Sequence, residues 1–395
     1  MKNMKRILLV TTSLNIGGIQ TAYVNMANAL SRSYEVDCFV YNPEGDLLER
    51  LESTVRLLPT TWMLRALGMS FREAWESRKA RIIFFKLFST AWAKIIDNRF
   101  PIEIALHFCP MLEDYDLAVA FSHEAGKHRV FTGCPRLVDQ NVKAKQKISW
   151  IHYDPLGQDL DNRYNAQFYQ KMDRVIAVSR SVMESCNRAF PALAPKLDYC
   201  YNFQDFSFLT KMSEEKQDTE FPSDGLICFS ACRLAHEKGI LRALEAFAPT
   251  LRQQKDIRWY IAGDGYERHE IEDKIKAESL GEYVVLLGNQ LNPYPYMKNA
   301  DLYLSVSYSE AAPVVYRESN YLGVPVFSTE TCSSRELLGS DEGNFICGNS
   351  KQELEEAFSA LMTHREKVKI AKDKLQRKQY NNDQAILKTR EWLND

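Results

Sequence analysis

Two basic residues stand where the chain is expected to turn from a strand into a helix. Arg233 and Lys238 lie in segment 230–239, after the apolar run 226–230 and before the amphipathic stretch 240–251. Two cations at the carboxyl end of a strand, beside the N-terminus of the next helix, suit a diphosphate and need no metal ion. The pattern therefore predicts a diphosphate site, with an exposed basic pair on a loop as the alternative.

Two carboxylates follow in the same half of the chain. Glu310 is expected in a loop after a strand, and Glu318 lies eight residues later, about two helical turns, so both can face the same side. Such carboxylates can each bind a pair of vicinal hydroxyls, one on a sugar and one on a ribose, unless Glu318 merely lies on a solvated helix face. The backbone amides around residues 312–315 would point at phosphates from the start of a helix. The residues predicted to contact the ligand in this turn are Pro313, Val314 and Val315.

A third candidate site is the pair Gly17-Gly18, between the apolar run 7–10 and a helical pattern at 20–30. Glycines there let the backbone approach a ligand, and the N-terminus of a helix offers N–H groups to an anion. A plain tight turn is the alternative. The dinucleotide fingerprint G-x-G-x-x-G and a Walker lysine are both missing, which argues against a dehydrogenase.

The elements that must position these residues alternate between short apolar runs and amphipathic stretches. Such alternation predicts mostly parallel sheets with helices on both faces, and 395 residues suit two such domains. Two doubly wound, Rossmann-like α/β domains that face each other across a cleft place a ligand between the carboxyl ends of their sheets. Strands are expected at 7–10, 36–41, 117–121, 148–151 and 175–178, and then at 226–230, 259–262, 284–287, 302–306 and 325–328.

Composition and charge narrow the class of protein. The formal net charge of -2 argues against general nucleic-acid binding. No run of 18 apolar residues lacks charges, and the chain leads directly into the apolar run 7–10, so neither a membrane span nor a signal peptide is expected. The nine scattered cysteines fit reduced thiols and a cytoplasmic location.

Taken together in this order, the motifs of the second half resemble family 4 of the retaining glycosyltransferases (glycosyl transferases group 1), which have the GT-B fold. The resemblance covers about residues 226–347 and is specific through the combination of its motifs. The matching stretches are Arg233-Leu-x-x-Glu-Lys-Gly239, Tyr260-Ile-Ala-Gly-Asp-Gly265, Leu286-Leu-Gly288, Asn299-Ala-Asp301, Glu310-x7-Glu318 and Leu322-Gly-Val-Pro-Val326. The first half matches more loosely, through Gly17-Gly18, Trp150-Ile-His-Tyr-Asp154 and Asp173-Arg-Val-Ile-Ala-Val-Ser179.

The resemblance implies roles for the charged residues of the second half. Arg233 and Lys238 would hold the donor diphosphate and stabilise charge on the leaving phosphate. Glu318 would bind the ribose hydroxyls, and Glu310 would bind hydroxyls of the transferred sugar. Further donor contacts are expected at Gly263, Asn289 and Leu291, the last two beside the base.

In the first half, the resemblance implies that Gly17 and Gly18 let the backbone close on the donor. His152 corresponds to a histidine near the reacting sugar, at the end of a strand. A histidine satisfied inside its loop is the alternative reading of His152, and His123 is a second candidate.

The implied domains are an acceptor-side domain at 1–210, a linker at 211–225, a nucleotide-sugar domain at 226–376, and a final helix at 377–395 that returns to the first domain. The implied activity is retaining transfer of a hexose-type sugar from a nucleotide diphosphate donor, with a UDP-sugar expected. The acceptor would be a saccharide or a lipid-linked saccharide in bacterial surface polysaccharide or glycolipid synthesis. No cofactor, metal or nucleic-acid partner is expected. A sugar-nucleotide epimerase of the same fold and a non-catalytic nucleotide-sugar scaffold are the alternatives.

One further pattern concerns metal binding. Asp114-Tyr-Asp116 spells D-x-D, which binds divalent metal in other transferases. It directly precedes the strand expected at 117–121, so we do not expect a metal site there.

Residues 56–100 combine basic and aromatic side chains at helical spacing. This pattern suits a helix that lies in the surface of an anionic membrane, and it predicts peripheral contact with the inner leaflet. Packing of its apolar face on the first domain's sheet is the alternative. The basic residues are Arg65, Arg72, Arg78, Lys79, Arg81, Lys86, Lys94 and Arg99, and the aromatic ones are Trp62, Phe71, Trp75, Phe84, Phe85, Phe88 and Trp92.

Overall fold

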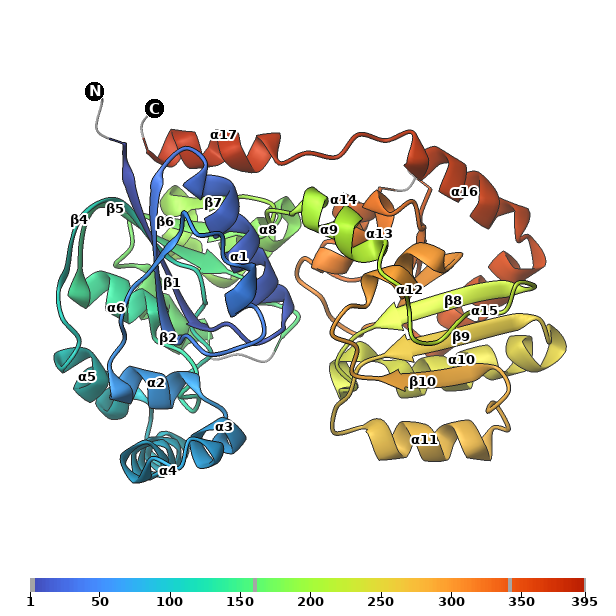
Figure 1. The fold of residues 1–395 in the computed structure, drawn as a ribbon, viewed down its shortest axis with the longest axis horizontal. Coiled ribbons are helices and arrows are strands. Elements are labelled where there is room, and N and C mark those ends of the chain that lie inside the picture. Colours follow the sequence, from blue (N-terminus) through green and yellow to red (C-terminus); the bar gives the residue numbers. More distant parts are fainter. Residues whose placement is uncertain (1–3, 159–161, 340–342, 394–395) are drawn as a thin grey trace. The chain divides into compact units, whose positions relative to one another are not determined.

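The computed structural model describes residues 4–158, 162–339 and 343–393, and the chain divides into two compact α/β domains (Figure 1). The first domain comprises Met1–Gln204 and Asn382–Asp395, and the second comprises Asp205–Asn381. Residues 1–3 of the predicted first domain and residues 394–395 of the predicted final helix lie outside the described residues.

Within the described residues, the first domain has one sheet of seven strands in the order β3-β2-β1-β4-β5-β6-β7, with every neighbouring pair parallel. Its strands are β1 (Arg6–Ser13), β2 (Glu35–Asn42), β3 (Arg56–Leu57), β4 (Leu112–Ala120), β5 (Val142–Ile151), β6 (Arg174–Ala177) and β7 (Leu197–Tyr199). Its helices are α1 (Gly18–Ser31), α2 (Trp62–Gly68), α3 (Phe71–Glu76), α4 (Ala80–Ile95), α5 (Arg99–His107), α6 (Cys134–Asn141), α7 (Asn162–Tyr169), α8 (Arg180–Ala189) and α17 (Asp383–Trp392), with 3-10 turns η1 (Leu48–Arg50) and η2 (Pro191–Lys196).

The second domain has a six-stranded parallel sheet in the order β10-β9-β8-β11-β12-β13, again counting only the described residues. Its strands are β8 (Leu226–Ala231), β9 (Ile257–Ala262), β10 (Val284–Gly288), β11 (Leu302–Ser305), β12 (Val326–Thr329) and β13 (Phe345–Cys347). Its helices are α9 (Phe206–Ser213), α10 (Ile240–Gln253), α11 (Arg268–Ala277), α12 (Tyr294–Asn299), α13 (Val314–Tyr321), α14 (Ser334–Leu338), α15 (Lys351–Thr363) and α16 (Glu366–Gln376), with the 3-10 turn η3 (His236–Lys238).

Strand β8 shows why these apolar runs form buried parallel strands. Cys228 packs in one apolar cluster, and its neighbours Ile227 and Phe229 pack in a second one. Successive side chains of a strand point to opposite faces, so both faces of the sheet are covered. The predicted fold class of two doubly wound, Rossmann-like domains is confirmed.

The strand order reverses at one point in each sheet, between β1 and β4 and between β8 and β11. Doubly wound sheets bind ligands outside the carboxyl ends of the strands at such a switch point. The loops after these four strands are therefore the first places to look for a site.

The domain boundaries differ from the predicted ones. The chain leaves the first domain after Gln204, and residues 211–213 of the predicted linker end helix α9 instead. The helix forms because the Asp205 carboxylate caps it, accepting a hydrogen bond from Phe208 N at 3.0 Å. At the other end, α17 packs in the first domain, where Trp392 lies against Trp150 with ring centroids 5.6 Å apart.

A buried ion pair lies inside the first domain. Arg136 and Glu124 have side chains that are 1% and 0% exposed, and Arg136 Nη2 lies 3.1 Å from Glu124 Oε2. Thr132 Oγ1 donates to the same oxygen at 2.8 Å, and Arg136 also donates to Asn98 Oδ1 at 2.8 Å. The pair therefore joins α6 to the loop after β4 and to the start of α5.

None of the helices within the described residues has both the length and the apolar character that a membrane crossing needs. The segment predicted to be a surface helix, residues 56–100, forms strand β3, helices α2, α3 and α4 and the start of α5 rather than one element.

Candidate active site

Arg233 and Lys238 lie at the carboxyl end of β8, in the loop and 3-10 turn that lead into α10. The side chain of Arg233 is 70% exposed, whereas that of Lys238 is 24% exposed. Gly239, with φ 67°, turns the chain between η3 and α10, and a Cβ there would meet the Val306 carbonyl oxygen. The placement at the carboxyl end of a strand is the one that the sequence predicts, and the structure adds that this strand borders the switch point.

Lys238 is paired with Glu310, which follows β11 on the other side of the switch point. Lys238 Nζ donates to Glu310 Oε1 at 2.5 Å, and Ser307 Oγ donates to the same oxygen at 2.8 Å. Burial alone would lower the pKa of Lys238, but the adjacent carboxylate outweighs burial and raises that pKa above its ordinary value. The structure thus brings a charged lysine and a carboxylate together at the carboxyl edge of the second sheet.

Arg233 is paired with a carboxylate as well. Its Nη2 lies 2.5 Å from Glu237 Oε1 in the same loop. Partial burial opposes the charge on Glu237, yet hydrogen bonds from its own backbone and from Arg233 lower the pKa of this carboxyl. Both cations of the predicted site thus have a carboxylate partner in this structure.

Gly263 holds the loop after β9 against the loop after β8. Its φ of 134° is a conformation that other residues rarely adopt, and a Cβ there would overlap the Cys232 carbonyl oxygen. Its N–H donates to the Gly288 carbonyl oxygen at 2.7 Å, so the ends of β9 and β10 are tied together. Gly263 therefore shapes the floor of the loop cluster that carries Arg233.

Glu318 is 4% exposed on α13, and Tyr294 Oη donates to its Oε1 at 3.3 Å. Helix α13 begins at Val314, so Glu310 precedes the helix. Glu310 and Glu318 are therefore not two helical turns apart as predicted, because only Glu318 lies on helical backbone. The two carboxylates reach their places from a loop and from a helix.

The other predicted donor contacts of the second domain lie on the same edge of its sheet. Pro313, Val314 and Val315 are partly exposed at the start of α13, which has no side-chain cap at Pro313. Asn289 and Leu291 follow β10 in an exposed loop, where Leu291 is 77% exposed. Asn289 and Leu291 thus lie on the loop after β10, and Pro313, Val314 and Val315 lie where the segment after β11 enters α13.

In the first domain, Gly17 and Gly18 lie where β1 leads into α1. Gly17 is the residue before the helix, and its carbonyl oxygen accepts from Thr21 N at 2.8 Å. No acidic residue lies in the first turn of α1, so its dipole is available to an anion. Gly18 is exposed.

His152 follows β5, and its ring packs against Phe121 at 4.6 Å and stacks on Trp150 at 6.2 Å. His123, which follows β4, lies 6.4 Å from His152. Both residues keep some surface, but His152 Nε2 and His123 Nδ1 are buried and have no hydrogen-bond partner among the described residues. Burial lowers the pKa of His123 to about 4, and burial followed by repulsion from His123 lowers the pKa of His152 well below its ordinary value. Both rings are thus neutral at neutral pH.

This histidine pair makes the stability of the first domain depend on pH. An unfolded histidine binds a proton below about pH 6.5, whereas folded His123 resists protonation until about pH 4. The unfolded state therefore binds more protons in that window, and the free energy of unfolding should fall as the pH falls from about 6.5 toward 4. Urea unfolding followed by tryptophan fluorescence reports this domain, because five of the six tryptophans belong to it.

The variant His123→Gln should show a shallower decline over the same pH window. His269→Gln is the matched control, since the His269 side chain is 93% exposed in the second domain. An equal slope for wild type and His123→Gln would contradict the assignment.

The D-x-D pattern does not precede a strand, because residues 114–116 lie inside β4. Strand β4 begins at Leu112, five residues before the predicted start. Its pairing with β5 is irregular between Leu112 and Tyr115, where Asp114 has φ 67°. Asp116 accepts hydrogen bonds from Arg6 N at 2.9 Å and from Lys145 Nζ at 2.7 Å, which are contacts within the sheet. Within the described residues, no group of three or more His, Cys, Asp or Glu side chains could hold a metal ion.

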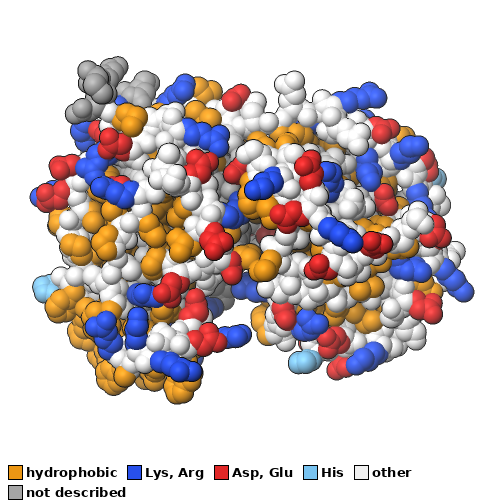
Figure 2. All heavy atoms as spheres, in the orientation of Figure 1, with side chains coloured by type: hydrophobic (Ala, Val, Ile, Leu, Met, Phe, Trp, Pro, Cys, Tyr) orange, Lys and Arg blue, Asp and Glu red, His pale blue; other side chains and the backbone are white. Residues whose placement is uncertain are grey.

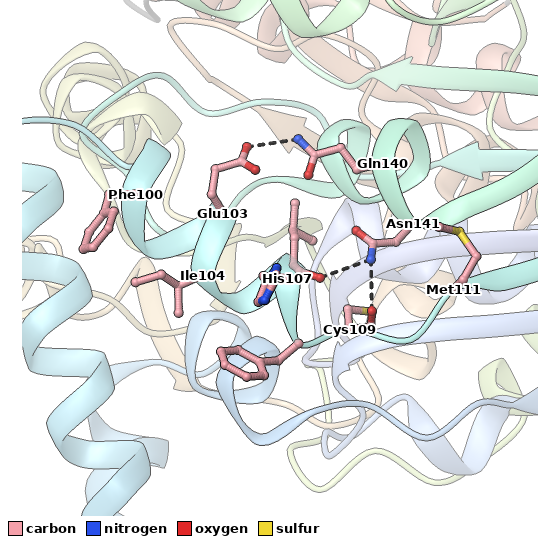
Figure 3. Close-up of a pocket in the computed structure, with 10 residues that line it drawn as sticks. Phe100, Glu103, Ile104, His107, Cys109, Met111, Gln140 and Asn141 are labelled. Carbon is pink, nitrogen blue, oxygen red and sulfur yellow. Dashed lines mark hydrogen bonds between the residues drawn. The ribbon is translucent and has the colours of Figure 1, made fainter.

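A surface groove on the first domain contains none of the predicted site residues (Figure 3). It lies at the amino end of β4, away from the edge that carries the histidines, and the Glu103–Gln140 hydrogen bond closes one side. Its lining includes Phe100, Ile104, Phe108 and Met111. The groove is therefore separate from the candidate active site.

Three residues that contact the predicted site residues were not assigned a role from the sequence. They are Ser307, Glu237 and Tyr294, which hydrogen-bond to Glu310, Arg233 and Glu318 respectively. Glu237 belongs to the Arg233–Gly239 motif, so its position was a signal. Nothing in the sequence marks the other two.

Comparison with known proteins places these motifs in a family. Residues 211–380 match the family described as glycosyl transferases group 1. The chain is 24% identical over 359 residues to "GalNAc-alpha-(1->4)-GalNAc-alpha-(1->3)-diNAcBac-PP-undecaprenol alpha-1,4-N-acetyl-D-galactosaminyltransferase" of Campylobacter jejuni, with 87% of this chain and 85% of the relative covered. It is 23% identical over 202 residues to an uncharacterized glycosyltransferase of Methanocaldococcus jannaschii, with 48% of this chain covered. The chain spans about half the length of that relative, 50%.

Among solved structures, the fold is similar to HepE of Anabaena in complex with UDP. The TM-score is 0.63 at 15% sequence identity, and 94% of each chain is covered. At this identity the likeness shows the fold alone. Residues 211–380 of the chain therefore match the glycosyl transferases group 1 family, and the fold of the chain is that of GT-B glycosyltransferases.

Proposed function

We propose that this chain transfers a hexose-type sugar from a nucleotide diphosphate donor, with retention of the anomeric configuration. The observation that carries the proposal is the Lys238–Glu310 pair, 2.5 Å apart at the carboxyl edge of the second sheet. Charge that develops on a leaving diphosphate needs fixed cations, and a sugar ring needs hydroxyl acceptors beside them. Both kinds of group meet at this pair.

Each second-domain residue has a proposed role. Lys238 and Arg233 exchange their carboxylate partners for the donor diphosphate. Glu310 then binds hydroxyls of the transferred sugar, and Glu318 binds the ribose. The backbone of Gly263 and the turn at Pro313, Val314 and Val315 contact the phosphates, while Asn289 and Leu291 contact the base.

The first domain supplies the remaining proposed residues. Gly17 and Gly18 contact the donor through their backbone, and His152 acts on the reacting sugar. Because the His152 ring is neutral, with Nε2 buried and unpartnered among the described residues, it is suited to a hydrogen bond with a sugar hydroxyl. A charged imidazolium is not required of it.

The proposed chemistry needs no enzyme nucleophile. The acceptor hydroxyl attacks the anomeric carbon on the face that the diphosphate leaves, a new C–O bond forms, and the bond to phosphate breaks. The departing phosphate oxygen takes the proton of the acceptor hydroxyl. Lys238 and Arg233 offset the charge on the diphosphate, which is the part that a divalent metal plays in other transferases.

The relatives suggest the classes of donor and acceptor. HepE was solved with UDP, and the printed name of the Campylobacter jejuni relative describes a lipid-linked saccharide acceptor. We therefore propose a UDP-sugar donor and a saccharide or lipid-linked saccharide acceptor, used on the cytoplasmic side of a membrane to which the enzyme binds peripherally. A sugar-nucleotide epimerase or a scaffold would use the same donor site without an acceptor.

A thermal-shift screen against UDP, GDP, ADP, CDP and their sugar conjugates tests the donor site. A ligand of the native state raises the melting temperature by mass action, about 2.7 kcal/mol of stabilisation at a hundredfold excess over Kd. We expect UDP and one UDP-sugar to stabilise the protein, and excess chelator to leave the shift unchanged. Loss of the shift in chelator would contradict the metal-independent site.

Product analysis separates the remaining alternatives. Incubation with the stabilising UDP-sugar and a lipid-linked saccharide should release UDP and yield a longer saccharide. A changed sugar without an acceptor would indicate an epimerase, and binding without turnover would indicate a scaffold.

A further inference from the structure

Helix α4 turns apolar side chains toward solvent. Phe84, Leu87 and Ile95 are 73%, 53% and 80% exposed along one side of the helix. The opposite side is buried and includes two polar residues, Lys86 and Ser89. A typical surface helix has an apolar stripe toward the core and polar residues outside, whereas α4 has apolar side chains on its outer side as well.

The buried side of α4 is tied to its neighbours, so the exposed stripe is held in place. Lys86 Nζ donates to the Leu67 carbonyl oxygen at 3.3 Å and lies 5.8 Å from the centre of the Phe71 ring. Phe85 packs on Trp62 with ring centroids 5.7 Å apart. Rolling the apolar stripe inward would break these contacts.

The apolar surface continues beyond α4. Trp75 of α3 is 71% exposed, Ile96 is 54% exposed, and Phe100 at the start of α5 is 48% exposed. Phe100 also lines the groove of Figure 3 and lies 4.9 Å from Trp92 between ring centroids. Hydrophobic side chains gather over α4 in Figure 2, with Lys and Arg side chains beside them. We define the α4 face as Trp75, Phe84, Leu87, Ile95, Ile96 and Phe100.

The segment that carries the α4 face is rich in basic residues, and two of them, Arg72 and Arg99, pair with Glu76 and Asp97. Residues 71–100 contain seven Lys or Arg and three Asp or Glu, and every one of the cations except Lys86 is exposed. Aromatic and aliphatic side chains bordered by cations suit the interface of a bilayer with anionic headgroups. A contiguous apolar surface of this kind is rare on a protein that meets only water.

We propose that the α4 face inserts into the headgroup region of a bilayer that contains anionic lipids, with α4 lying in the membrane plane. The proposal deepens the proposed function, and it rests on that function only for the statement that the acceptor is lipid-linked. The occupant is a lipid surface rather than a second copy of the chain. A two-fold dimer through this face would place the exposed cations of each copy against those of the other.

The α4 face is attached to the edge of the first sheet that carries Gly17 and Gly18. Gly68, at the end of α2, abuts the Thr12 carbonyl oxygen and Asn42 N at the carboxyl ends of β1 and β2. Glu73 of α3 accepts hydrogen bonds from Asn15 Nδ2 and Asn42 Nδ2, each at 3.1 Å. A membrane bound by α4 would thus present its lipid-linked saccharides near that edge.

Vesicle binding by Leu87→Glu tests the proposal. The full-length protein is mixed with vesicles of phosphatidylcholine and phosphatidylglycerol, and the bound fraction is measured by flotation. We expect Leu87→Glu to weaken binding about tenfold or more, since it replaces an inserted leucine by a carboxylate. Leu387→Glu is the matched control, because Leu387 on α17 is 56% exposed, close to the 53% of Leu87, and lies outside the face.

Equal binding by the two variants would overturn the proposal. So would a wild-type dimer that Leu87→Glu disperses, or binding that high salt abolishes completely, which would indicate charge contact without insertion. Quenching of Trp75 fluorescence by brominated acyl chains, lost in Trp75→Phe, is the expected sign of insertion. Transfer to a water-soluble acceptor should be unaffected by Leu87→Glu, so a failure of docking and a failure of the proposed reaction remain distinguishable.

Discussion

Replacing Lys238 with alanine is expected to lower kcat for sugar transfer about a hundredfold to a thousandfold. The change removes the ammonium group that stabilises charge on the leaving diphosphate. It also leaves Glu310, whose side chain is 17% exposed, without its 2.5 Å partner. Steady-state kinetics with the donor identified by thermal shift would measure the loss, which should fall mainly on kcat if the contact strengthens in the transition state.

Lys298→Ala is the control for this experiment, because Lys298 is an exposed lysine at the end of α12. It should retain wild-type kcat. Burial opposes the charge on Lys238, but Glu310 holds its pKa above 10.5, so this lysine should add no inflection to the pH profile of kcat below that pH. Unchanged turnover in Lys238→Ala would remove the diphosphate assignment.

Replacing Glu124 with leucine is expected to lower the free energy of unfolding of the first domain by about 3–5 kcal/mol. Arg136, 1% exposed, would keep a buried charge without its carboxylate partner. Burying an unpaired charge costs more than losing an exposed ion pair, because water cannot compensate it. Urea unfolding followed by tryptophan fluorescence measures the effect in this domain.

The exposed pair Glu113–Lys143 provides the control, with side chains 48% and 66% exposed and a distance of 2.6 Å. Glu113→Leu should change the free energy of unfolding by less than about 1 kcal/mol. The double variant Glu124→Leu/Arg136→Met should recover much of the loss, because it removes both charges. Similar changes in the free energy of unfolding for Glu124→Leu and Glu113→Leu would show that the buried pair contributes no more to stability than the exposed pair.

Most of the fold could be predicted because both sheets are parallel and buried on both faces. Such strands appear in the sequence as continuous apolar runs, and Leu226–Ala231 is an example. The short strands β3, β7 and β13 were missed, since two or three residues give no periodic signal. The linker was misplaced at its start, because a polar sequence at the end of a capped helix looks like a loop.

The candidate site could be predicted as a set of residues but not as a set of contacts. The strand ends alone place the backbone of Arg233, Lys238 and Glu310 at one edge of a sheet, independently of the contacts that their side chains make. That Lys238 pairs with Glu310 depends on two loops 72 residues apart, which no local pattern encodes. The spacing argument for Glu310 and Glu318 failed because it assumed helical backbone where Ala311 to Pro313 form a loop.

In the basic and aromatic segment 56–100, a helix that packs on the domain can also have an apolar outer side. The sequence allowed either a membrane helix or a core helix. Helix α4 has apolar residues around its whole circumference, so Ile82 and Phe85 pack inward while Phe84 and Leu87 face outward. Hydrophobic periodicity identifies the buried side of a helix only when one side is apolar. Because α4 is apolar on two sides, the sequence could not show which of them is buried.

The path of the chain has a consequence for how the two domains are connected. Gln204 N donates to Asn382 Oδ1 at 3.0 Å, and Asn382 Nδ2 donates to the Gln204 carbonyl oxygen at 2.8 Å. The chain therefore departs for Asp205 and comes back from Asn381 through neighbouring positions of the first domain. In topological terms, the whole second domain is an insertion at one position of the first domain, and helix α17 is the last element of the first domain.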